Sequence, residues 1–110
     1  MTNSLFDFDE YRGYLSRRSG KPGTRQGHRS AMAAAMKCHS SYLTKVLNFD
    51  AHISLEQAYR LNTYFNHSAD ESDFFLRLVQ KGRAGTQELV QYFEKQLREI
   101  SQRRLLIRER

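Results

Sequence analysis

Apolar residues recur at helical spacing along most of this chain. Ser4 precedes a stripe formed by Leu5, Phe8, Tyr11 and Leu15, and the stripe ends before Ser19-Gly-Lys-Pro-Gly23. A serine side chain accepts hydrogen bonds from N–H groups that lack a partner at a helix start, whereas Gly and Pro end helices. The pattern therefore predicts a first helix over about residues 4 to 18.

Further helix starts follow from the same reasoning. Thr24 or a neighbour opens an Ala- and Met-rich segment that reaches Met36, and a short segment from Ser40 to about Leu47 also fits a helix. Capping-box patterns begin at Ser54 and Ser68, and Thr86 can cap a last, longer helix after Gly85. Because no stretch alternates with a period of two, we predict an all-α fold of five core helices plus a C-terminal helix.

The length of 110 residues suits one domain with a modest core. No apolar run approaches the roughly 20 residues that a membrane-spanning helix needs, so we expect no membrane partner. The lone Cys38 cannot form an intramolecular disulfide, which fits a reducing compartment. We therefore expect the protein in the cytoplasm.

Positive charge is concentrated in one part of the sequence. From Arg17 to Phe49 there are seven basic residues and no acidic residue. The other segments contain residues of both signs, and the whole chain has a net charge of +6. A locally basic surface attracts a polyanion. This block indicates nucleic acid as a partner.

The segment from Arg29 to Asn48 meets the demands of two helices that cross at a short turn. Close approach requires a small residue, which Ala33 supplies, and apolar residues are required on both helices around that contact. They are present at the required spacing, as Met32, Met36, Cys38, Leu43 and Val46. A helical core would need the same residues, so this pattern argues for the fold before it argues for function.

Here the sequence resembles the lambda-repressor-like, or Xre-type, helix-turn-helix regulators. The segment from Asn48 to Phe65 looks like that family's loop and fourth helix. Tyr42-Leu-Thr-Lys-Val-Leu-Asn48 and Asp73-Phe-Phe-Leu-Arg-Leu-Val79 are similar to a family of poorly characterised bacterial regulators, in which such a domain precedes a larger C-terminal region. One departure is Lys37, at the turn position where the family usually has Gly; a positive φ there would cost on the order of 1 kcal/mol.

The resemblance implies a DNA-binding transcriptional regulator with a helix-turn-helix domain over residues 1–82 and a C-terminal helix over 86–110. The first helix of the motif spans about 25–36, and the recognition helix, about 40–48, enters the major groove of double-stranded DNA. By position, the residues that would read bases are Ser40, Ser41, Thr44 and Lys45. The candidates for phosphate contacts are Arg25, His28, Arg29, Lys37, Tyr42 and Asn48.

Other chemistry finds little support in the sequence. Catalysis needs a nucleophile, a base and an orienting group together, and the sequence suggests no such combination. We therefore expect no enzyme and no small-molecule substrate. Cys38 and His39 lack a second ligand pair at zinc-site spacing, and no cofactor or metal is expected. His39 is interpreted as a helix cap or phosphate neighbour, and His28, His52 and His67 as surface or loop histidines.

Two alternatives stay open. Val90, Phe93, Leu97, Ile100 and Ile107 have heptad-like spacing, so the last helix either forms a homodimer or packs on its own domain. The second alternative is a protein-interaction adaptor without DNA binding, in which Phe74, Phe75 and the last helix bind a partner.

Overall fold

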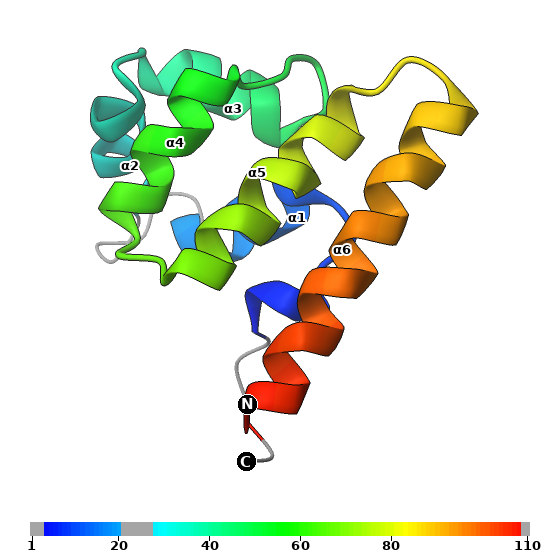
Figure 1. Ribbon diagram of the computed structural model, residues 1–110. Helices are drawn as coiled ribbons and strands as arrows, with labels where there is room; N and C mark the ends of the chain where they lie inside the picture. The colour runs from blue at the N-terminus through cyan, green and yellow to red at the C-terminus, as the bar shows by residue number, and fades with distance from the viewer. Residues whose placement is uncertain (1–3, 21–27, 109–110) are drawn as a thin grey trace.

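The computed structural model describes residues 4–20 and 28–108, and over these residues it is all-helical (Figure 1). A short 3-10 helix, η1 (Leu5–Asp7), precedes the six α-helices. These are α1 (Tyr11–Ser19), α2 (Arg29–Met36), α3 (Ser40–Leu47), α4 (Leu55–Tyr64), α5 (Ala69–Arg83) and α6 (Gln87–Arg108). None of the described helices is long and apolar enough to cross a membrane.

The first predicted helix is wrong in its N-terminal half. Ser4 forms a capping box with Asp7, but the turn that it starts ends at once, because Phe8 is extended. A second cap then starts α1, where the Glu10 carboxylate accepts from the Arg12 N–H at 2.7 Å. The bend between the two caps lets Leu5 join the core and brings the Phe6 ring to 5.0 Å from that of Phe74.

The last three helices begin at the capping residues that the sequence predicts. Ser54 and Ser68 each form a complete capping box, and the Thr86 hydroxyl accepts from the Leu89 N–H at 3.2 Å. The helix predicted from about residue 25 begins at Arg29, and residues 21–27 lie outside the described part of the chain.

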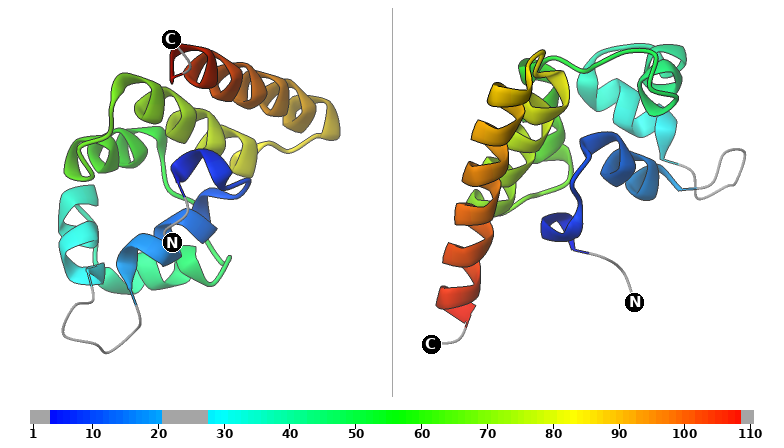
Figure 2. Two further views of the ribbon diagram at one scale, coloured as in Figure 1. Left: turned by 90° about the horizontal axis from the view of Figure 1, so that it is seen from below. Right: turned by 90° about the vertical axis from the view of Figure 1, so that its right-hand side faces the viewer.

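The helix α6 packs along α5 on one side of the molecule, whereas α2 and α3 lie on the far side (Figure 2). Leu97 and Ile100 of the heptad-like stripe are buried, so this part of the stripe packs within the chain. Phe74 and Phe75 are buried as well. Their assignment as partner-binding residues is therefore wrong, because both rings belong to the core.

A chain of hydrogen bonds links polar groups beneath the turn between α4 and α5. The Asn62 Nδ2 donates to the Ser72 carbonyl, so its Oδ1 accepts from the His67 Nδ1 at 2.7 Å. The His67 Nε2 is then the acceptor for the Tyr14 hydroxyl at 2.8 Å, and the Tyr14 oxygen accepts from Arg18 at 2.7 Å. This arrangement fits a neutral imidazole, which burial favours by lowering the pKa of His67.

We predict that stability falls as the pH drops below about 6.5. Burial lowers the pKa values of His67 and His52 from 6.5, so the unfolded chain binds more protons in this range. The stabilisation is complete above about pH 6.5 and is lost as the pH falls through the lowered values. Urea unfolding at pH 7.5 and 5.5 measures this loss, and His67→Gln, which cannot titrate there, should show a smaller one. An equal loss in wild type and variant would contradict the role of His67.

Gly82 is required by the close approach of Tyr11. A Cβ at this position would lie 2.8 Å from two carbons of the Tyr11 ring. The ring cannot shift easily, because it is fully buried and its hydroxyl is bonded to His52 and to the Ile53 N–H.

We therefore expect Gly82→Ala to lower the free energy of unfolding by about 1 to 3 kcal/mol through overpacking, despite the higher helix propensity of Ala. Urea denaturation measures the change. Gly85→Ala is the matched control, since a Cβ there meets nothing within 4 Å. Equal effects at the two positions would rule out the steric explanation.

Candidate nucleic-acid interface

The α2 and α3 helices are held together by the apolar contact that the sequence predicts. Ala33 is 2% exposed, and Met32 and Met36 are fully buried on the same helix. Leu43 and Val46 are fully buried on α3. These core assignments are confirmed, and they orient α3 with its opposite side outward.

The turn between the two helices ends α2 in a left-handed conformation. Lys37 has φ 61° and ψ 46°, the conformation expected at the position where the resembled family has Gly. The Cys38 N–H donates to the Ala33 carbonyl and the Lys37 N–H to that of Ala34, at 3.0 and 3.1 Å, which is the Schellman pattern. Cys38 packs partly under the turn, and its burial raises the pKa of the thiol.

Four predicted DNA-contacting side chains share the outer face of α3, which we define as Ser40, Ser41, Lys45 and Asn48. All four are exposed. Thr44 is different: its hydroxyl accepts from Arg29 at 3.3 Å and donates to the Ser40 carbonyl at 3.1 Å. These bonds occupy the hydroxyl within the chain and leave it poorly placed to read a base.

The predicted phosphate contacts are more scattered. His28 and Lys37 are exposed beside α2, whereas Arg29 is half-buried and connects α2 to α3 through Thr44. The Tyr42 hydroxyl donates to the His52 carbonyl. Arg25 lies outside the described residues. His39 occupies the N-cap position of α3, but its side chain makes no capping hydrogen bond.

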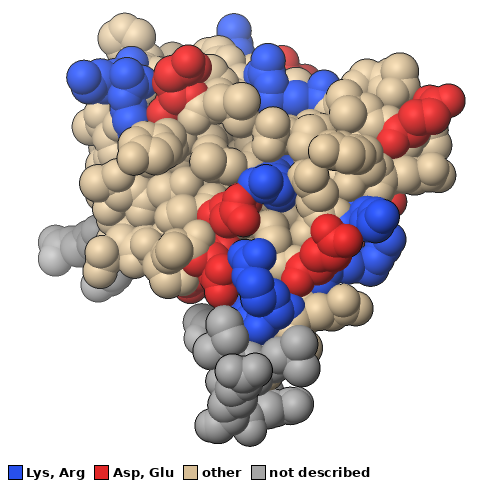
Figure 3. Space-filling model, in the orientation of Figure 1, with Lys and Arg blue, Asp and Glu red and all other residues tan. Residues whose placement is uncertain are grey.

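The pairing of charged side chains differs between the two sides of the molecule. Among the described residues, no ion pair involves a base between Arg29 and Asn48. On the face formed by α4, α5 and α6, acidic and basic side chains are intermixed (Figure 3). Lys81 pairs there with Glu94 at 3.5 Å, and Arg103 with Asp70 at 2.9 Å. The described bases of α2 and α3 are therefore without an ion-pair partner, whereas several bases of the opposite face are paired.

The loop after α3 carries an aromatic residue that the sequence reasoning missed. Phe49 has φ 66° and is 59% exposed, and the guanidinium of Arg12 lies 4.2 Å from the centroid of its ring. The only signal was an aromatic residue at a polar turn. Deeper in the same loop, the Tyr11 hydroxyl lies 2.9 Å from the His52 Nδ1. His52 is thus a loop histidine, as predicted, but it is tied to the core.

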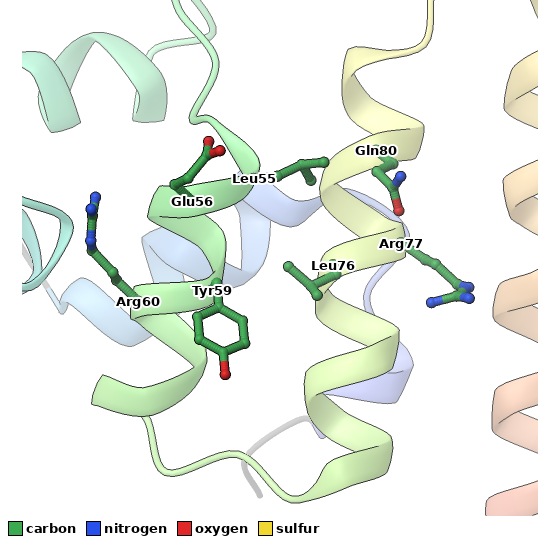
Figure 4. Close-up of a pocket in the computed structure, with 7 residues that line it drawn as sticks. All are labelled: Leu55, Glu56, Tyr59, Arg60, Leu76, Arg77 and Gln80. Carbon is green, nitrogen blue, oxygen red and sulfur yellow. The ribbon is translucent and has the colours of Figure 1, made fainter.

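An apolar groove lies between α4 and α5 (Figure 4), and no residue of the outer face of α3 lines it. Leu55 and Leu76 lie between the two helices, and Tyr59 projects beside them. Leu55 is 42% and Tyr59 66% exposed. Glu56, Arg60 and Arg77 also line this groove, so charged side chains border its apolar residues.

Comparisons of the chain with protein-family models, with curated proteins and with solved structures found no match. The resemblance to Xre-type regulators therefore stays a prediction that rests on the residues quoted for it.

Replacing Lys37 by Gly should raise the free energy of unfolding by about 1 kcal/mol, because Gly adopts a positive φ without steric cost. Urea denaturation measures the gain. Lys37→Ala is the control, since it removes the same charge but keeps the Cβ, and it should leave stability nearly unchanged. A gain with Ala equal to that with Gly would show that charge, and not backbone strain, is relieved.

Proposed function

We propose that this chain is a DNA-binding transcriptional regulator of the lambda-repressor-like type, with α3 as its recognition helix in the major groove. The observation that carries the proposal is the outer face of α3, which is exposed and polar, and among the described residues no base between Arg29 and Asn48 is held in an ion pair. An α-helix is about 10 to 12 Å across with its side chains, which matches the major groove at about 12 Å wide.

The side chains divide into three roles in this proposal. Ser40, Ser41 and Lys45 face base edges, where hydroxyls discriminate weakly and a lysine favours guanine. Lys37, Asn48 and His28 contact phosphates and set the register. Arg29 acts as a positioning residue, because its bond to Thr44 fixes α3 relative to α2.

The salt dependence of binding tests the proposal. We expect wild type to bind a short duplex at about 50 mM salt, with log affinity falling linearly as log salt rises. Lys45→Ala should weaken binding, whereas Lys95→Ala, which removes an equal charge from the exposed side of α6, should not. Fluorescence anisotropy titrations measure both. No binding at 50 mM salt, or equal losses from the two variants, would contradict the proposal.

A homodimer through α6 also stays a prediction. Because Leu97 and Ile100 are buried, the large apolar residues left for a second copy near the start of this helix are Leu89 and Tyr92, which are exposed. Dimers of such modules engage two half-sites about one helical turn apart, which would extend the short sequence that one copy reads.

The groove between α4 and α5 favours the second candidate, a protein-interaction adaptor. Its exposed Leu55 and Tyr59 are the kind of apolar surface that binds protein partners. This function does not need the outer face of α3. The absence of salt-dependent DNA binding would therefore favour it over the first proposal.

A further inference from the structure

Phe49 combines two features that core packing does not explain. Its φ of 66° is rare for an aromatic residue, since the left-handed region is used mainly by Gly, Asn and Asp. Its side chain is also 59% exposed, so the strain is not offset by full burial of the ring. Strained residues of this kind gather at functional sites.

The backbone around Phe49 is fixed by a second Schellman pattern. The Phe49 N–H donates to the Val46 carbonyl at 3.0 Å, and the Asp50 N–H donates to the Lys45 carbonyl at 2.9 Å. The same pattern occurs at Asn66, where φ is 58° and the residue type suits it. The fold therefore needs a left-handed residue after α3, but it does not need a phenylalanine there.

The ring is supported from beneath by a guanidinium that cannot move freely. Arg12 is 9% exposed, donates to the Ala51 carbonyl at 3.2 Å and pairs with Glu10 at 3.1 Å. Its guanidinium lies 4.2 Å from the ring centroid. One face of the aromatic ring is thus held by a cation–π contact, while a large part of the side chain remains open to solvent.

The position of the ring relative to DNA follows from the length of α3. With the first turn of α3 at the base edges, the far end of the helix lies about 12 Å away, near the sugar–phosphate wall of the groove. Phe49 is just beyond that end. Asp50 follows it and is exposed, so this end of the interface has no electrostatic attraction of its own.

We propose that Phe49 is an apolar DNA contact that packs on the deoxyribose of the strand bordering the major groove. This inference rests on the proposed function. A contact of this kind adds affinity without reading sequence and without releasing counterions. The pre-positioned ring loses little side-chain entropy on binding, because Arg12 already holds it.

Phe49→Gly tests the inference, because Gly satisfies the left-handed backbone and removes only the ring. We expect DNA affinity to fall about fivefold to tenfold, as for roughly 50 Å² of lost apolar contact, while the urea midpoint does not fall. The loss should be the same at low and high salt and on unrelated duplexes. Phe49→Asn, which also tolerates this backbone, should give the same result.

Asn66→Gly is the matched control, since it relaxes the same backbone conformation at the end of α4 and should leave DNA affinity unchanged. Asp50→Asn tests separately whether this end of α3 lies near a phosphate. Removal of the acid there should raise DNA affinity more at low salt than at high salt.

If wild type binds DNA and Phe49→Gly binds it with the same affinity, the inference is overturned while the proposed function stays intact. A loss that depends on the DNA sequence would also overturn it, because the ring would then be reading bases. Failure of wild type to bind any duplex at low salt would instead remove the proposed function itself.

Discussion

Three successive helix ends in this protein reverse direction through a residue in the left-handed conformation, and none of the three is glycine. Lys37 ends α2, Phe49 ends α3 and Asn66 ends α4. Each reversal costs on the order of 1 kcal/mol for an ordinary L-residue, and less for Asn. The cost is offset by the buried residues that the turns bring together, since burial of one Leu or Val contributes about 1.5 to 3 kcal/mol.

These reversals determine what the molecule presents to solvent. The turn at Lys37 crosses α3 over α2 so that Leu43 and Val46 enter the core, and the outer face of α3 is left exposed as a consequence. The turn at Phe49 ends the helix after two turns and places an aromatic ring at its far end. The α6 helix covers α5 on the other side of the molecule, so it does not obstruct α3.

Much of the fold could be predicted because its signals are local. The caps at Ser54, Ser68 and Thr86 act within three residues, and the small Ala33 at the crossing is visible in the pattern. The break after Asp7 could not be predicted, because the contact that accompanies it joins Phe6 and Phe74, which are far apart in the sequence. For the same reason the partners of His52 and His67 were not foreseen, since each is hydrogen-bonded to a tyrosine of α1.

Some features of the candidate site could likewise be predicted from the sequence, and others could not. Exposure of Ser40, Ser41 and Lys45 follows from helical periodicity and could be predicted. The engagement of Thr44 by Arg29 could not, because it depends on the crossing of two helices. Nor could the conformation of Phe49, because neither its left-handed backbone nor the position of Arg12 beside its ring is visible in the sequence.

The claim that α3 meets DNA through its outer face is tested most directly by backbone amide NMR shifts recorded while a short duplex is added. The account predicts that the largest changes fall between Lys37 and Asp50, with α6 little affected. Changes confined to the groove between α4 and α5, with α3 unmoved, would contradict it.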